Sequence, residues 1–258
     1  MIEVKNLTKE FTLSKKQMKE SGATSNRIQV VNNLSFTCKP GRVFSLLGPN
    51  GAGKTTTLRM IATILKPTSG TIQVSGLDTV KQSSEARKKM GFLTGSTGLY
   101  DRLTPNEVIR YFSDLFGVPR DVFKQRKEKL FDLLGMNDFA NKKIGQLSTG
   151  MRQKVSIVRT MIHDPEVVVF DEPTSGLDVI TAENIIRMVD DCRTQGKTVI
   201  FSSHIMSEVD LLADDLAIIH KGELIFHDTM DNFREKMEAP TLTKEFIRLV
   251  NNSQIQTQ

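Results

Sequence analysis

The chain is poor in cysteine and contains no long hydrophobic run, and both absences limit what it can be. Its 258 residues include two cysteines, Cys38 and Cys192, which stand apart and without metal-ligand spacing. We therefore expect neither a disulfide framework nor a zinc site, and a reducing, cytoplasmic compartment suits such a chain. No apolar run reaches the roughly 18 positions that a membrane span needs, and the start lacks the apolar core of a signal peptide. Any membrane role is therefore predicted to be peripheral.

A strong charge of one sign is also missing. The chain carries 35 basic and 30 acidic side chains, a net charge of +5. Its densest basic clusters, at residues 15–19 and 87–89, have no interleaved aromatic side chains on which bases could stack. We therefore predict no nucleic-acid partner.

Residues 48–56 contain the most informative pattern that is present. They read GPNGAGKTT and fit G-x-x-x-x-G-K-[ST]. The apolar residues 43–47 before them predict a buried strand, and apolar positions from Leu58 to Leu65 predict a helix after them. Free N–H groups of such a loop and the helix N-terminus bind phosphates, while Lys54 reaches the terminal phosphates and Thr55 Oγ holds Mg²⁺. We predict that the chain binds a nucleoside triphosphate through Gly48, Pro49, Asn50, Gly51, Ala52, Gly53, Lys54, Thr55 and Thr56.

A second pattern places acidic residues after a buried strand. Residues 167–170 form a continuous apolar run, typical of a parallel strand that is buried on both faces, and Asp171 and Glu172 follow it. Asp171 is expected to hold Mg²⁺ through water, and Glu172 to polarise an attacking water. Further back, Ser148 and Gly150 open a predicted helix and offer a weaker second anion site.

The order of predicted elements indicates an α/β fold. Strands and helices alternate on both sides of residues 104–162, which predicts a parallel sheet with right-handed crossovers. Three amphipathic helices within 104–162 predict a helical lobe inserted into that sheet, and alternating residues in 2–8 and 30–36 predict two strands of a side sheet. Residues 13–27 are polar and predict an exposed loop with a composition typical of disorder.

We expect one ATPase domain over residues 1–226 and a short, partly helical tail over 227–258. Within the domain, the core comprises residues 1–93 and 163–226, and the helical lobe comprises about residues 94–162.

Motifs in a fixed order over nearly all of residues 1–226 resemble the nucleotide-binding subunit of an ABC transporter. The similar segments are Gly48–Thr56 (Walker A), Leu147–Gln153 (the LSGGQ signature), Val167–Glu172 (Walker B and the catalytic glutamate), Ser175–Asp178 (the D-loop) and His204 (the switch histidine). Phe11 stands where this family places an aromatic ring against adenine.

The resemblance implies the ABC type of P-loop NTPase fold, with a RecA-like parallel-sheet core, an antiparallel β side sheet and an inserted helical subdomain. It implies ATP and Mg²⁺ as cofactors, with Lys54, Glu172 and His204 as catalytic residues. It also implies a head-to-tail homodimer in which Ser148 and Gly150 of one copy cover the ATP of the other, with Asp178 at the shared site.

Two positions depart from the family pattern. Thr149 replaces a signature glycine, and Gly95 stands where the family carries the Q-loop glutamine, which normally touches Mg²⁺ and links the site to the transporter. Our hypothesis is that Thr94, Ser96 or a water molecule fills that role.

The stretch 91–107 is most similar to NatA-like exporters. This likeness implies an ABC-2-type multi-span membrane permease as partner, a place at the cytoplasmic face of the membrane, and Na⁺ efflux as the transport reaction.

Three alternatives stay open at this point. A soluble ABC ATPase acting on DNA or ribosomes would usually carry coiled-coil inserts, zinc cysteines or a second nucleotide-binding half. A nucleotide-sensing regulatory subunit would bind ATP without turnover, and Gly95 leaves room for it. A P-loop small-molecule kinase would leave the signature and the D-loop without a purpose.

Overall fold

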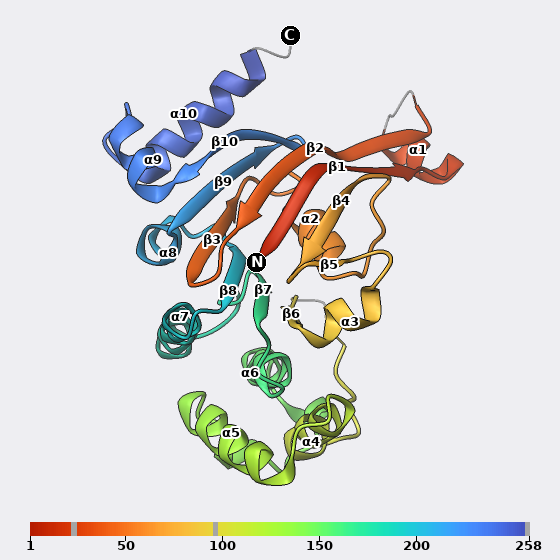
Figure 1. Cartoon of the computed structure of the whole chain (residues 1–258), viewed down its shortest axis with the longest axis vertical. Helices are drawn as coiled ribbons and strands as arrows, with labels where there is room; N and C mark the ends of the chain where they lie inside the picture. The colour runs from red at the N-terminus through yellow and green to blue at the C-terminus, as the bar shows by residue number, and fades with distance from the viewer. Residues whose placement is uncertain (22–24, 95–97, 256–258) are drawn as a thin grey trace.

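Two sheets and a helical lobe make up the fold (Figure 1). The computed structural model describes residues 1–21, 25–94 and 98–255. The elements are, in chain order, β1 (Ile2–Thr12), α1 (Lys15–Ser21), β2 (Arg27–Cys38), β3 (Arg42–Leu47), α2 (Lys54–Ile61), β4 (Ser69–Val74), β5 (Leu77–Asp78), α3 (Ser83–Lys88), β6 (Met90–Leu93), α4 (Pro105–Leu115), α5 (Arg120–Leu133), two short 3-10 helices (Asn137–Phe139 and Ile144–Gln146), α6 (Thr149–Met161), β7 (Val167–Asp171), α7 (Val179–Thr194), β8 (Thr198–Ser202), α8 (Met206–Leu212), β9 (Asp215–His220), β10 (Glu223–Thr229), α9 (Met230–Lys236) and α10 (Leu242–Ile255).

The central sheet has the strand order β10-β9-β3-β8-β7-β6, and the side sheet has the order β2-β1-β4-β5. Within the central sheet β6, β7, β8, β3 and β9 run parallel, and only β10 is antiparallel to its neighbour. All pairings of the side sheet are antiparallel. The predicted fold class is confirmed, because a parallel core, an antiparallel side sheet and an inserted helical lobe are all present.

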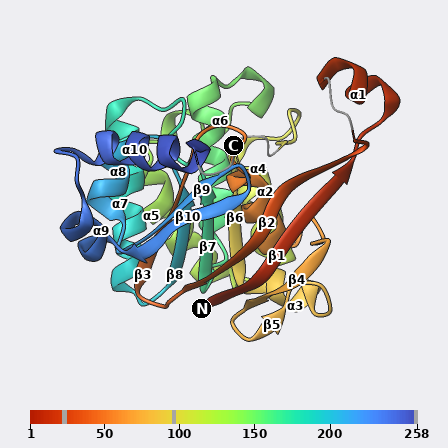
Figure 2. The ribbon, with the colours of Figure 1, turned by 90° about the horizontal axis from the view of Figure 1, so that it is seen from above.

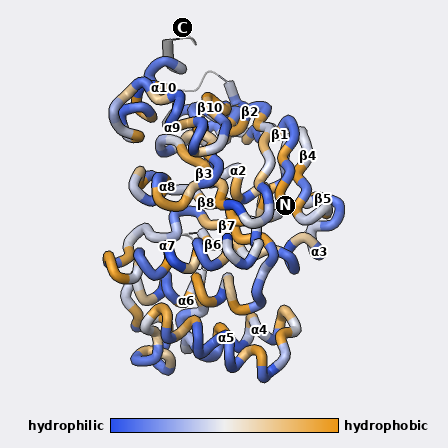
Figure 3. The backbone as a smooth tube through the Cα atoms, turned by 60° about the vertical axis from the view of Figure 1, so that its left-hand side comes forward, coloured by the Kyte–Doolittle hydropathy of each residue, from blue (hydrophilic) through white to orange (hydrophobic). Residues whose placement is uncertain are grey.

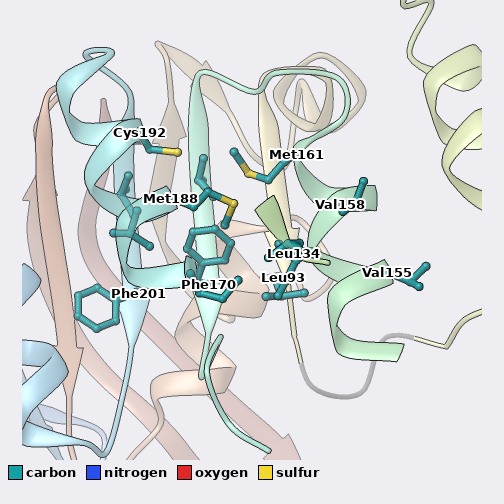
Figure 4. Close-up of a cluster of buried hydrophobic side chains, with 14 of the residues drawn as sticks. Leu93, Leu134, Val155, Val158, Met161, Phe170, Met188, Cys192 and Phe201 are labelled. Atoms are coloured by element: carbon teal, nitrogen blue, oxygen red, sulfur yellow. The ribbon is translucent and has the colours of Figure 1, made fainter. Parts of the chain in front are cut away.

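Alternate residues of the central strands enter two different hydrophobic cores. Val168 and Phe170 of β7 belong to the core shared with α5, α6 and α7, whereas Val167 and Val169 belong to the core shared with the side sheet and α2. This explains why β7 reads as an uninterrupted apolar run, since neither of its faces meets water. Figure 4 shows part of the first core, in which Phe170 lies between side chains of α6 and of α7. Hydrophobic stretches accordingly gather through the centre of the molecule, around β7 and β8 (Figure 3).

The helical lobe is inserted between β6 and β7 and consists of α4, α5 and α6, which lie below the sheets in Figure 1. Its first helix begins at a capping box, in which the Thr104 hydroxyl accepts a hydrogen bond from the Glu107 N–H and the Glu107 carboxylate accepts one from the Thr104 N–H. Pro105 follows at the first helical position, so the predicted start of α4 is confirmed. The three helices predicted within residues 104–162 are also present, as α4, α5 and α6.

The prediction of a loop over residues 13–27 is wrong for Lys15–Ser21, which form helix α1. Lysine, glutamine, methionine and glutamate favour helix, and the N–H of Met18 closes the first turn on the carbonyl of Ser14. The strands on either side are also longer than predicted, because Thr12 pairs with Arg27 and the Leu13 N–H bonds to the Asn26 carbonyl. Figure 2 shows α1 standing away from the body at the end of this long hairpin.

The last part of the chain contains more structure than the sequence indicated. Strand β10 runs through residue 226, the predicted boundary of the domain, and α9 and α10 follow it. Helix α10 packs against α8 and β10, with Leu242, Phe246 and Leu249 lying against the core. No helix in the described part of the chain is both long and apolar enough to cross a membrane.

Truncation of a core side chain tests the described packing. Phe201 on β8 is 1% exposed and lies in the core shown in Figure 4. Phe201→Ala should lower the free energy of unfolding by about 3–5 kcal/mol, since it removes a buried ring and leaves a cavity. Leu115→Ala, at a side chain that is 63% exposed, is the control and should change it by less than about 0.5 kcal/mol. Equal effects in urea unfolding would contradict this packing.

Candidate functional site

The phosphate-loop pattern lies between β3 and α2, as predicted, and it is packed tightly against neighbouring backbone. Gly53 has a φ of +107°, and a Cβ atom there would lie 2.7 Å from the Val30 carbonyl oxygen. A Cβ atom on Gly48 would lie 2.3 Å from the carbonyl oxygen of Ile219. Glycine is therefore required at both positions. The loop shares a cavity with Val30 and Glu172, and the loop residues that line it run from Asn50 to Thr56.

Lys54 begins α2 and points back over the loop. Its side chain is buried, and its ammonium group donates hydrogen bonds to the carbonyl oxygens of Gly48 (2.6 Å) and Pro49 (3.2 Å). Burial lowers the pKa of Lys54, and the carboxylates of Glu172 and Asp171 act in the opposite direction. A buried cation at the start of a helix, beside a glycine-rich loop, is suited to a triphosphate.

Thr55 and Asp171 meet at the carboxyl ends of β3 and β7. The Thr55 hydroxyl donates a hydrogen bond to Asp171 Oδ1 (3.1 Å), and the Ser202 hydroxyl donates another to the same oxygen (2.8 Å). One hydroxyl and one carboxylate suit Mg²⁺, which commonly takes few protein ligands and completes its shell with water and phosphate oxygens. The described residues contain no cluster of three or more His, Cys, Asp or Glu side chains that could hold a metal ion.

Glu172 follows Asp171 with its backbone in the left-handed region, at a φ of +53°. This conformation costs a non-glycine residue about 1–3 kcal/mol. The Glu172 N–H donates hydrogen bonds to the carbonyl oxygen (3.1 Å) and the hydroxyl (3.2 Å) of Ser202, which hold it there. Its carboxylate Oε1 lies 3.3 Å from Nδ1 of His204, whose side chain is 57% exposed. Two residues predicted to be catalytic are thus in contact.

A cavity of about 470 Å³ opens beside these groups. Thr55, Asp171 and Glu172 line it from the sheet side, and Thr149 and Gln153 line it from the start of α6. Gln153 also donates a hydrogen bond to the Pro173 carbonyl (3.3 Å). Arg59 and Thr94 line the same cavity. Of the two side chains proposed to replace the Q-loop glutamine, only Thr94 lies in the described residues. Gly95 and Ser96 lie outside the described residues.

The other signature residues, Ser148 and Gly150, lie at the N-terminus of α6, where Ser148 is exposed. Ser148 caps this helix, accepting a hydrogen bond from the Met151 N–H (3.3 Å). A Cβ atom on Gly150 would lie 3.7 Å from the carbonyl oxygen of Gly176, so the signature borders the D-loop of the same copy. Neither Ser148 nor Gly150 is among the residues that line the cavity of about 470 Å³ or the phosphate-loop cavity.

Asp178 is the N-cap of α7. Its carboxylate accepts hydrogen bonds from the hydroxyl (2.7 Å) and the N–H (2.9 Å) of Thr181, and these bonds lower its pKa. The next two side chains, Val179 and Ile180, are largely exposed.

Phe11 lies near the end of β1, opposite Ile28 of β2. The ammonium of Lys9 lies 5.1 Å from the centre of its half-buried ring. Phe11 is not among the residues that line the phosphate-loop cavity, although Val30 on the neighbouring strand is.

Two residues beside Glu172 and His204 were not predicted from the sequence. Phe246 of α10 lines a cavity together with both of them and with Gly48 to Asn50, and helical spacing from Leu242 to Leu249 was the only signal for it. Glu208 of α8 is buried next to the loops that carry Glu172 and His204, and no motif marked it.

Comparisons with known proteins agree with this geometry. Residues 31–175 match the family model described as ABC transporter. The chain is 46% identical over 222 residues to the ABC transporter ATP-binding protein NatA of Bacillus subtilis (strain 168), which covers 85% of this chain and 90% of that protein. It is 33% identical over 224 residues to the linearmycin resistance ATP-binding protein LnrL of the same organism, which covers 87% of this chain and 72% of that protein.

A solved structure, the dimeric post-hydrolysis state of the ATP-binding cassette MJ0796 bound to ADP and Pi, superposes with a TM-score of 0.78 at 26% identity. The superposition covers 89% of this chain and 99% of that one. The chain therefore belongs to the ABC transporter family, as an ATP-binding subunit of a transporter.

Proposed function

We propose that two copies of this chain pair head to tail around two ATP molecules, hydrolyse them, and thereby drive export through an ABC-2-type membrane permease. ATP hydrolysis is supported most directly by the contact between Glu172 Oε1 and His204 Nδ1, which lie 3.3 Å apart. This contact lies beside the hydrogen-bonded pair Thr55 and Asp171. A carboxylate next to a metal-suited pair of oxygens is placed to activate water against a bound phosphate.

In this proposal each residue has a separate task. Lys54 and the loop N–H groups bind the β- and γ-phosphates, and Thr55 and Asp171 would hold Mg²⁺, which neutralises charge on the phosphate oxygens when bound. Glu172 accepts a hydrogen bond from the attacking water and polarises it. His204, held next to that carboxylate, contacts the γ-phosphate and fixes the attack geometry.

The pairing is proposed because Ser148 and Gly150 of the signature do not line the phosphate-loop cavity of their own chain. Ser148 lies at an exposed helix start and offers its hydroxyl and nearby N–H groups outward. Such a site can bind the γ-phosphate held by a second copy, and the MJ0796 cassette that resembles this chain is dimeric. Asp178 and the exposed Val179 and Ile180 would then lie at the interface.

The cargo is proposed from likeness. Residues 91–107 resemble NatA-like exporters, so we propose Na⁺ efflux and an ABC-2-type permease, with the cassette bound peripherally at the cytoplasmic face of the membrane. The name of the relative LnrL refers to linearmycin resistance, so cassettes similar to this chain are linked to more than one kind of cargo.

The first prediction separates ATP binding from hydrolysis. Glu172→Gln should reduce phosphate release by at least about 100-fold, since the amide cannot take a proton from water, while ATP affinity is retained. With saturating ATP and Mg²⁺ this variant should elute as a dimer in gel filtration, because the nucleotide that joins the copies is not consumed.

Glu183→Gln, at an exposed carboxylate on α7, is the matched control and should hydrolyse ATP at the normal rate. If Glu172→Gln stayed monomeric with ATP and Mg²⁺, the pairing would be refuted. If it hydrolysed ATP normally, the assigned role of Glu172 would be wrong.

The second prediction concerns the adenine ring. Phe11→Ala should weaken ATP binding by about 1–3 kcal/mol through lost stacking, and should leave binding of inorganic triphosphate unchanged. Tyr111→Ala, at an exposed ring of the helical lobe, is the control. Equal losses for both ligands, measured by calorimetry, would remove the stacking role of Phe11.

The third prediction concerns transport. Proteoliposomes that contain this chain and an ABC-2-type multi-span permease should move ²²Na⁺ only when ATP and Mg²⁺ are supplied, and Glu172→Gln should abolish this flux. ATP hydrolysis without ²²Na⁺ flux would contradict the sodium assignment. Failure of the permease to bind the cassette or to alter its hydrolysis rate would contradict the ABC-2 coupling.

A further inference from the structure

Helix α8 carries a buried carboxylate that joins the two loops of the proposed catalytic centre. Glu208 is 7% exposed, and its two oxygens accept hydrogen bonds from different loops. Oε1 accepts from the Thr174 hydroxyl (2.7 Å), and Oε2 accepts from the Ser203 hydroxyl (2.7 Å). Thr174 follows Glu172 by two residues, and Ser203 directly precedes His204.

The surroundings of Glu208 show that these two contacts are its main support. No basic side chain in the described ranges forms an ion pair with it. A buried carboxylate is costly unless its oxygens are hydrogen-bonded, so both hydroxyls are held firmly. Thr174 and Ser203 are themselves buried, and the Ser203 hydroxyl also accepts a hydrogen bond from the Ile205 N–H (3.0 Å). The loop that carries His204 is thereby fixed on both sides of the histidine.

We propose that Glu208 is a positioning residue for ATP hydrolysis. By bridging Thr174 and Ser203 it sets the distance between the Glu172 carboxylate and the His204 ring, 3.3 Å in this structure. It is not among the residues that line the cavities around Glu172 and His204, and it acts through the two loops. The inference rests on the proposed hydrolytic function of Glu172 and His204.

The side-chain chemistry defines an informative pair of variants. Glu208→Gln keeps both contacts, because its amide oxygen accepts from one hydroxyl and its amide nitrogen donates to the other. Glu208→Met has a similar length but can make neither contact. We expect Glu208→Gln to keep kcat within about threefold of the wild type, and Glu208→Met to lose at least tenfold in kcat with KM for ATP within twofold, because misplaced catalytic groups slow the chemical step.

A double-mutant cycle tests the hydrogen bond between Thr174 and Glu208. Thr174→Val removes one hydroxyl while preserving shape, and should lower kcat in the wild type but not in Glu208→Met. Thr160→Val is the matched control, since its buried hydroxyl donates to the carbonyl oxygens of Ser156 and Phe92 instead. It should leave kcat unchanged in both backgrounds.

Hydrogen exchange gives a readout that does not require turnover. The backbone amides of Glu172, Thr174, Ser175 and residues 203–205 should exchange at least tenfold faster in Glu208→Met than in the wild type or Glu208→Gln, while the unfolding midpoints confirm that all three are folded. Unchanged exchange in Glu208→Met would show that Glu208 does not hold the two loops, whether or not the wild type hydrolyses ATP. Absence of phosphate release by the wild type would refute the proposed function, but not the contacts of Glu208. Faster exchange with unchanged kcat, or equal effects of Thr174→Val in both backgrounds, would overturn the positioning role alone.

Discussion

The register of three parallel strands determines where all the proposed chemistry takes place. Within the central sheet β8 lies between β3 and β7, and Ser202 at its end is aligned with Leu46 on one side and with Asp171 on the other. The loops that follow these strands therefore begin at the same edge. Because of this alignment the Ser202 hydroxyl reaches Asp171, the Thr55 hydroxyl reaches the same carboxylate oxygen, and Glu172 meets His204. A shift of one residue in either strand would separate these groups.

The same edge combines a close-packed loop with a strained one. The phosphate loop fits only because Gly48 and Gly53 let backbone atoms approach where a side chain would collide. Glu172 is held in an unfavourable backbone conformation by two hydrogen bonds to Ser202. Strain of this kind persists only where the surroundings fix it, and two cores, one on each face of the sheet, make these surroundings rigid.

The local patterns of the sequence were sufficient to predict most of the fold. The run at residues 167–170 predicted a doubly buried strand, the glycine pattern predicted the turn before α2, and apolar spacing predicted α4, α5 and α6, all of which are present. The signals were strong because each depends on neighbouring residues. Helix α1 was missed because its polar composition is typical of both a surface helix and a loop, so composition alone could not distinguish them.

The contacts around the site were harder to predict because they join distant residues. Thr174 and Glu208 are 34 residues apart in sequence, and their hydrogen bond depends on how α8 lies against the sheet. Phe246 reaches the His204 cavity only because α10 folds back across α8 and β10. The roles assigned to all the site residues stay predictions. Phe11, Ser148 and Asp178 also lie outside the cavity that Thr55, Asp171 and Glu172 share.

In the proposed assembly each ATP is enclosed by the phosphate loop of one copy and the signature of another. Disulfide cross-linking tests it directly, because both native cysteines are buried. Copies carrying Ser148→Cys should be mixed with copies carrying Asn50→Cys and oxidised with and without ATP and Mg²⁺. A cross-linked pair of chains should form when nucleotide is present, and only when both variants are in the mixture. A chain that carries both substitutions should also be oxidised. If the pair of chains did not form, and the doubly substituted chain formed the cross-link within itself, the head-to-tail pairing would be wrong.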